Sequence, residues 1–254
     1  MKKIIILLVS LLMLFSLVGC GSDKASEATV WSEQLKTKGK IVIGISPDFP
    51  PFESLTTDGK IEGFDPDVIN ELIKYLDEDV EIEFAQIEFD NIVTAVQTGQ
   101  VDIGLSGFTY DPDRDVIFTK PYVESGQAIL VTKDSGINSI EELKGKTVGG
   151  QTGTTGYEAA EAIEGTKEVV SFVDCMVGFA SVGSTIDAFV TDYGVVKNYA
   201  DANGMMVLDE LLSTEEMSII VKNGNNLLAD KLNECIEQFL NSAEYEELRI
   251  KWGI

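Results

Sequence analysis

The sequence predicts an α/β protein built as two lobes with a cleft between them. Short apolar runs alternate with segments of helical periodicity, which is typical of α/β folds. The alternation occurs in two successive series, the second beginning near Gln127. The chain of 254 residues, 44% of them hydrophobic, is long enough to bury a sizeable core in one large domain or two small ones.

The first series opens with an apolar run typical of a buried strand, and Asp65-Pro66 then matches the start of a helix, with Asp as N-cap and Pro in the first position. A later helix is closed by a glycine. The predicted elements are a strand at 41–45, a helix from 65, a strand at 80–84, a helix at 89–98 closed by Gly99, and a strand at 101–105.

The second series contains a Gly-rich loop between a strand and a helix, and a capping box formed by Ser139 and Glu142 on a short helix. After it, a strand leads into two C-terminal helices. The predicted elements are strands at 128–132, 147–149, 169–172, 188–191 and 218–221, the loop 150–156, and helices from 157, at 227–240 and at 243–252.

The N-terminus has the pattern of an export signal. Lys2 and Lys3 precede an apolar run at 4–18 that is too short to span a bilayer as a helix, for which about 20 residues are needed. In place of a small-x-small cleavage site stands Leu17-Val18-Gly19-Cys20, which resembles a bacterial lipobox. We therefore predict a signal peptide at 1–19, then a lipidated Cys20 and a flexible tether within 20–39. An ordinary signal with an incidental cysteine, or an uncleaved anchor, is the alternative.

Charge and composition exclude several classes of function. The formal net charge of −24 argues against a nucleic-acid partner and against charge-driven docking on anionic lipid, so membrane attachment must come from acyl chains. The absence of histidine excludes His-based triads and His-ligated zinc, and we expect no cofactor or metal. A Cys175–Cys235 disulfide is conceivable, but Cys235 falls on the apolar face of a helix and reads as a buried thiol.

The predicted strands place polar residues at one edge of each sheet. Ligands of open α/β sheets bind at the carboxyl ends of strands, which are followed here by 46–52, 106–114, 150–157 and Asp192. Arg114 is one of only two arginines, and its planar guanidinium offers two parallel donors to a carboxylate. Pairing with Asp113 or Asp115 at the surface is the alternative.

The Gly-rich loop at 150–156 suits a small anion. Glycines let backbone N–H groups approach a ligand, and the N-terminus of the following helix favours negative charge. The loop lacks the lysine and the spacing of a phosphate-binding loop, and its glycines do not match a dinucleotide fingerprint. A carboxylate fits better than a nucleotide, and a plain Gly-rich turn is the alternative.

An ordered set of short motifs resembles the polar amino-acid-binding proteins of ABC importers, solute-binding protein family 3. The resemblance extends from about Lys40 to Trp252. It rests on Gly44–Glu53 (GISPDFPPFE), Gly63–Asp67 (GFDPD), Phe89-Asp90, Val101-Asp102, Ser106–Thr109 (SGFT) with Arg114, Phe118 with Pro121-Tyr122, Leu143–Lys146, Gly153–Thr155, Ile186–Ala188 and Asp192-Tyr193.

The resemblance implies a type II periplasmic-binding-protein fold with two crossing strands as a hinge, near 125–127 and 216–219. Lobe one would comprise 40–124 plus 220–254, and lobe two 128–215. The implied partners are an amino acid ligand, captured by closure of the two lobes, and the permease and ATPase subunits of an ABC importer. The protein would act as a monomer, lipid-anchored at the outer face of a Gram-positive-type membrane, and would not be an enzyme.

The resemblance also implies roles for site residues. Arg114 would clamp the α-carboxylate, helped by Thr109 and by Thr154 or Thr155. Asp192 would pair with the α-ammonium, helped by the Gly107 carbonyl. Phe49 and Phe89 would flank the ligand's side chain. The complete predicted ligand-binding set is Ser46, Phe49, Phe89, Ser106, Gly107, Phe108, Thr109, Arg114, Gln151, Thr154, Thr155 and Asp192.

Departures from the family pattern leave the ligand open. Ser46 stands where binders of basic amino acids often carry an acid, and Phe49 stands where Tyr is common. An enzyme on the same scaffold, resembling a cyclohexadienyl dehydratase, would need Asp48 or Glu53 as a general acid with a raised pKa. An extracellular sensor domain would need a separate signalling partner.

Overall fold

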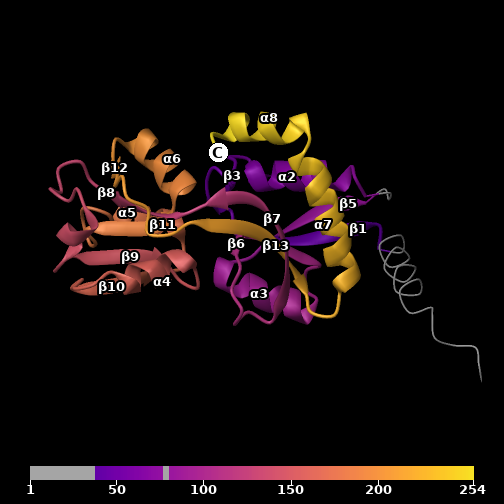
Figure 1. Ribbon diagram of the computed structural model, residues 1–254, viewed down its shortest axis with the longest axis horizontal. Coiled ribbons are helices and arrows are strands. Elements are labelled where there is room, and N and C mark those ends of the chain that lie inside the picture. The colour runs from indigo at the N-terminus through magenta and orange to yellow at the C-terminus, as the bar shows by residue number, and fades with distance from the viewer. Residues whose placement is uncertain (1–37, 77–79) are drawn as a thin grey trace, which may run out of the picture.

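A computed structural model describes residues 38–76 and 80–254, and it contains two five-stranded sheets that lie side by side with helices on both faces (Figure 1). We call the parts built around the first and second sheet lobe one and lobe two. The two-lobed α/β prediction is confirmed. The predicted signal peptide at 1–19 and the lipidation site Cys20 lie outside the described residues.

The sheet of lobe one has the strand order β5-β1-β6-β13-β7 and is mixed. Its inner strands β1 and β6 are parallel, whereas β13 runs antiparallel to both β6 and β7. The elements of lobe one are β1 (Lys40–Ile45), α2 (Phe64–Ile73), β5 (Glu81–Gln86), α3 (Phe89–Thr98), β6 (Ile103–Thr109), β7 (Val116–Ser125), β13 (Glu215–Lys222), α7 (Asn226–Leu240) and α8 (Ala243–Trp252), with a small sheet of β2 (Asp48–Phe49), β3 (Glu53–Leu55) and β4 (Ile61–Glu62).

The sheet of lobe two has the order β10-β9-β11-β8-β12, with β8 antiparallel to β11. All five residues of each of β8, β9 and β11 are buried, which explains why these strands read as continuous apolar or small-residue runs. The elements of lobe two are β8 (Gln127–Val131), a 3₁₀ helix (Ile140–Leu143), β9 (Thr147–Gln151), α4 (Thr155–Ala162), β10 (Glu168–Phe172), α5 (Cys175–Ser181), β11 (Ala188–Asp192), α6 (Tyr193–Asn203) and β12 (Met206–Val207).

The chain passes between the lobes twice, at adjacent points. It leaves lobe one after Ser125, the last residue of β7, and it returns at Glu215, which pairs with Ser125 across the β7–β13 ladder (Figure 1). Gly126 lies between β7 and β8, where a Cβ atom would come within 2.3 Å of the Ser213 carbonyl oxygen. Only glycine allows the two segments to cross this closely. The predicted lobe boundaries stay a prediction.

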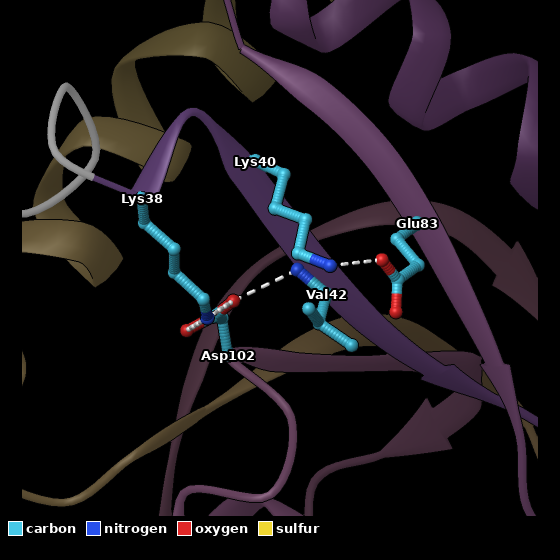
Figure 2. A network of polar contacts seen from close by, with 5 residues as sticks. All are labelled: Lys38, Lys40, Val42, Glu83 and Asp102. Carbon is cyan, nitrogen blue, oxygen red and sulfur yellow. Dashed lines mark hydrogen bonds and ion pairs between the residues drawn. The ribbon is translucent and has the colours of Figure 1, made fainter.

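Asp102 fastens the start of β1 to β6. Its side chain accepts a hydrogen bond from Val42 N at 2.7 Å, and its own N–H donates to the Val42 carbonyl at 2.8 Å (Figure 2). Lys38 donates to the same carboxylate at 2.7 Å, and Lys40 pairs with Glu83 on β5. The carboxylate thus extends the β1–β6 pairing before Ile103, which gives the Val101-Asp102 motif a structural reason.

The helix predictions succeed where the signal is local. Helix α3 ends at Gly99, whose φ of 75° is left-handed as predicted. The N-cap prediction for Asp65 is wrong, because Gly63 precedes helix α2 and Asp65 is instead buried in its first turn, accepting from Tyr122 Oη at 2.9 Å. The capping box is also wrong, because Ser139 makes no side-chain cap and Glu142 accepts from Asn138 N at 2.6 Å.

The structure also bears on the predicted state of the two cysteines and on whether a helix could span a membrane. Cys235 is fully buried in the core as predicted, and neither Cys175 nor Cys235 forms a disulfide in the described part of the chain. Among the described residues no helix is both long enough and apolar enough to cross a bilayer.

Candidate functional site

A cavity of about 20 Å³ lies between the two lobes at the carboxyl ends of their central strands. A space of this size holds about one water molecule, so a larger ligand enters only when the lobes part. Lobe one and lobe two both contribute to its walls. The lining residues are Asp48, Phe49, Phe89, Ser106, Gly107, Thr109, Arg114, Gln151, Thr154, Thr155 and Asp192.

The structure brings together around this cavity 10 of the residues predicted from the sequence. Ser46 and Phe108 are the two that do not line it. Ser46 is buried behind Asp48 and donates to Asp48 Oδ1 at 2.8 Å. Phe108 is fully buried and stacks under Phe89, with ring centroids 4.8 Å apart. Both support the wall from behind; Phe108 does so because alternate residues of strand β6 point to opposite faces.

Arg114 lines the cavity and carries an unsatisfied donor. Its Nε faces Asp111 Oδ2 at 3.2 Å, and its Nη2 donates to the carbonyl of Gly153 in lobe two at 2.8 Å. Nη1 is buried and has no hydrogen-bond partner. The guanidinium lies 5.7 Å from the Phe89 ring and 5.4 Å from the Phe108 ring, within cation–π range. Burial lowers its pKa from the usual value, and a buried unpaired donor of this kind calls for an acceptor.

Asp192 supplies the opposite charge from lobe two. It is the last residue of β11 and directly precedes helix α6, with 6% of its surface exposed. Ser125 donates to its Oδ1 at 2.6 Å. Burial raises the pKa of Asp192 to about 7, although the Ser125 hydrogen bond opposes the shift. A cation entering the cavity would therefore favour the ionised carboxylate.

The Gly-rich loop forms the lobe-two wall as predicted. Thr154 is the N-cap of α4: its hydroxyl accepts from Tyr157 N at 3.2 Å and donates to the Gln151 carbonyl at 2.8 Å. Gly153 adopts a left-handed φ of 75°, which places its carbonyl against Arg114. The loop therefore reaches across the cavity to lobe one with its main chain.

Asp48 is a lining residue that the predicted set omitted. Its carboxylate, in lobe one, accepts from Gln151 Nε2 at 2.8 Å and from Cys175 N at 2.9 Å, both in lobe two. Burial raises its pKa. Its position directly after the predicted strand 41–45 was the available signal, but its partners lie more than 100 residues away, 103 and 127 along the chain.

A buried acid pair lies behind Ser106. Ser106 Oγ donates to Glu53 Oε1 at 2.6 Å and accepts from Ser46 N at 3.2 Å. Glu53 and Asp65 are fully buried side by side, and Tyr122 donates to Asp65. Burial raises the pKa of Asp65 to about 7 and that of Glu53 well above its usual value. The pair supports the cavity wall and does not line the cavity.

The arrangement suits a small ligand with both charges. A buried guanidinium donor and a buried carboxylate line the same cavity from opposite lobes, and aromatic rings flank it. Fixed partners of opposite sign in a desolvated space recognise a zwitterion. Residues 38–76 and 80–254 hold no cluster of His, Cys, Asp or Glu able to bind a metal ion.

Comparisons with known proteins converge on one family. The family model described as bacterial extracellular solute-binding proteins, family 3, matches residues 41–254. The chain is 30% identical over 262 aligned positions to the arginine-binding extracellular protein ArtP of Bacillus subtilis strain 168, covering 99% of this chain and 98% of that protein.

Two solved structures are similar across most of the chain. An ancestral arginine-binding protein bound to glutamine superposes with a TM-score of 0.78 at 34% identity, covering 84% of this chain and 97% of that one. The ancestral amino acid-binding protein AncCDT-1, described as a precursor of cyclohexadienyl dehydratase, gives a TM-score of 0.80 at 32% identity, covering 87% and 99%.

Proposed function

Because the chain belongs to the bacterial extracellular solute-binding proteins of family 3, we propose that it captures an amino acid by closure of its two lobes and delivers it to the permease of an ABC importer. One observation carries the proposal. Arg114, whose Nη1 is buried without a hydrogen-bond partner, lines the same cavity as the buried Asp192. An α-amino acid supplies a carboxylate to the first group and an ammonium to the second.

The remaining lining residues support this orientation of the ligand. Phe49 and Phe89 flank the space beside the charged groups and would contact the ligand's side chain. Hydrogen bonds accepted by the Gly153 carbonyl and the Asp48 carboxylate already join the lobes, so the cavity corresponds to a closed state. Because the similar proteins are named for arginine and glutamine, these two amino acids are the first ligands to test.

We further propose that a lipid on Cys20 holds the protein at the outer face of the membrane, at a Gram-positive-type surface. The lipobox-like sequence Leu17–Cys20 and the extracellular nature of the family support export followed by anchoring. The protein would act as a monomer with the permease and ATPase subunits as its partners. Anchoring keeps a binding protein near its permease where no outer wall retains it.

Isothermal titration of the parent protein and of an Arg114→Ala variant with L-arginine and L-glutamine tests the assignment. Loss of Arg114 leaves the ligand carboxylate buried without a partner, so affinity should fall by about 2–5 kcal/mol. Arg249 is the only other arginine, lies in α8 with 41% of its side chain exposed, and provides the matched control. Arg249→Ala should bind as tightly as the parent. Equal affinity of parent and Arg114→Ala would refute the site.

One observation favours a second candidate, an enzyme on the same fold. The pKa of Asp192 is raised to about 7 inside the cavity, as a general acid requires, and AncCDT-1 is described as a precursor of a dehydratase. We place this candidate second because Asp192 opposite Arg114 suits an ammonium better than a substrate without one. Incubation with prephenate and arogenate distinguishes the two: product formation would establish the enzyme.

A further inference from the structure

A glutamate at the interlobe crossing joins two cavity-lining threonines from opposite lobes. Glu215 is half-buried and begins β13, where the chain returns to lobe one. Its Oε2 accepts from Thr109 Oγ1, at the end of β6, at 2.8 Å, and from Thr155 Oγ1, at the start of α4, at 2.7 Å. Both threonines line the cavity. One carboxylate oxygen therefore receives a hydroxyl from each lobe.

The remaining contacts fix this carboxylate in place. Ser213 Oγ donates to Glu215 Oε1 at 2.7 Å and accepts from Gln127 N at 3.1 Å. Gln127 Nε2 donates to Thr155 Oγ1 at 3.2 Å. Because every one of these groups lies on the segments that cross between the lobes or on the cavity wall, Glu215 is held where the lobes meet.

Counting hydrogens decides what the two threonines can offer a ligand. A hydroxyl has a single hydrogen and two lone pairs. The hydrogens of Thr109 and Thr155 are both donated to Glu215, so toward the cavity these hydroxyls present only lone pairs. Two oxygens without a free hydrogen cannot donate to a carboxylate, but they can accept from an ammonium.

We propose that Glu215 is a specificity-determining residue of the ammonium site: it orients Thr109 and Thr155 as acceptors and adds its negative charge beside Asp192. This inference rests on the proposed function and revises the roles expected for the two hydroxyls, which the family resemblance assigned to the carboxylate. The ligand carboxylate is then left to Arg114 and main-chain N–H groups. Ser125 already occupies one oxygen of Asp192, so further acceptors complete the coordination of a group with three N–H donors.

A comparison of ligands with and without the ammonium group tests the proposal. Isothermal titration uses two pairs: L-arginine with 5-guanidinopentanoic acid, and L-glutamine with 4-carbamoylbutanoic acid. The proteins are the parent, Glu215→Gln and the control Glu216→Gln. Glu216 follows on the same strand but is exposed and does not line the cavity.

Glu215→Gln should weaken binding of the L-amino acid by about tenfold or more, while the analogue that lacks the ammonium binds as well as before or better. Glu216→Gln should leave both ligands within about twofold of the parent. Equal weakening of both members of a pair would show that Glu215 only holds the lobes together, and it would overturn the proposal. Unchanged binding of the amino acid would overturn it as well.

A second variant covers the case in which the analogue binds too weakly to measure or Glu215→Gln fails to fold. Thr155→Val removes one acceptor and preserves all charges, so it should weaken binding of the L-amino acid about threefold to tenfold. The radius of gyration of the liganded protein should stay unchanged. Unaltered affinity of Thr155→Val would overturn the proposal. Failure of the parent to bind any amino acid would instead refute the proposed function itself.

Discussion

Lobe one meets the cavity with aromatic rings, a guanidinium and the carboxylate of Asp48, whereas lobe two meets it with a helix N-terminus and the carboxylate of Asp192; both lobes contribute hydroxyls. Behind the wall, lobe one buries Glu53, Asp65 and Tyr122 together, a cluster that fixes Ser106. Lobe two instead positions its groups through secondary structure, with Thr154 capping α4 and Asp192 preceding α6. One wall is shaped by side-chain packing and the other by the ends of helices.

This difference has a consequence for binding. The partner expected for the ligand carboxylate, Arg114, belongs to lobe one, and the partner expected for the ammonium, Asp192, belongs to lobe two. A ligand that carries both charges therefore bridges the lobes and stabilises the closed state more than a ligand that carries one. Substitutions at three places test this contrast: at the lobe-two carboxylate, at the contact between the lobes, and in the segment that precedes both lobes.

The largest effect is expected at the lobe-two charge. The pKa of Asp192 is about 7 without ligand, and an ammonium beside it favours the ionised form. Binding should therefore release a proton, and affinity should rise from about pH 5 to about pH 8 by up to roughly a hundredfold. Titration in buffers of different ionisation enthalpy measures the released proton. Asp192→Asn should bind weakly and with little dependence on pH; a steep dependence in that variant would assign the titration to another group.

Stability of the ligand-free protein should move in the opposite direction. Burial raises the pKa of Asp192 and of Asp65 to about 7, above the value of an unfolded chain, so the folded state holds these protons to higher pH. The stability they contribute is fully present below about pH 4 and is lost as the pH rises through about 7. Urea unfolding across this range checks the sign, and Asp192→Asn should reduce the slope.

A smaller effect is expected at the contact between the lobes. Asp48→Asn keeps the shape, and its carbonyl oxygen can still accept from Gln151 and Cys175 N, which share one oxygen of Asp48, but both hydrogen bonds lose the charge of the carboxylate. The closed state should lose about 1 kcal/mol, seen as roughly fivefold weaker binding through faster dissociation. Stopped-flow kinetics separates the two rates. Asp58→Asn, on an exposed turn of lobe one, is the control. Equal effects of the two substitutions on affinity would contradict a role of Asp48 in holding the lobes closed.

The elements that could be predicted from sequence are those with local signals. Helix α3 follows from its periodicity and from Gly99, and α8 is found with its predicted bounds. Strand β7 was not predicted because only three of its ten residues are buried and they do not alternate. Helix α5 was missed because it has only seven residues, and α6 because its apolar face is weak, with three buried residues in eleven.

The site shows the same limit. Ten lining residues could be predicted because strand ends and the family motifs mark them. Asp48 and Glu215 escaped because their roles depend on partners far along the chain, 127 residues away for Cys175 and 106 for Thr109. A carboxylate in a sequence does not indicate which distant hydroxyl or amide it will accept from. Such contacts exist only once the chain has folded and, for Asp48, only once the lobes meet.

The smallest effect on affinity is expected from the segment that precedes both lobes. Cys20 lies before the first residue matched by the family model, which begins at 41, and no lining residue precedes 48. Cys20→Ala should therefore leave the dissociation constant of L-arginine or L-glutamine unchanged and release the protein from cell membranes into the medium, as fractionation and immunoblotting would measure. Released protein with altered affinity would contradict the independence of anchor and site, and membrane retention of Cys20→Ala would contradict the lipid anchor. Retention on the cell with an intact site is what couples capture between the lobes to delivery at the permease, because a ligand held by a diffusing protein is lost to the importer.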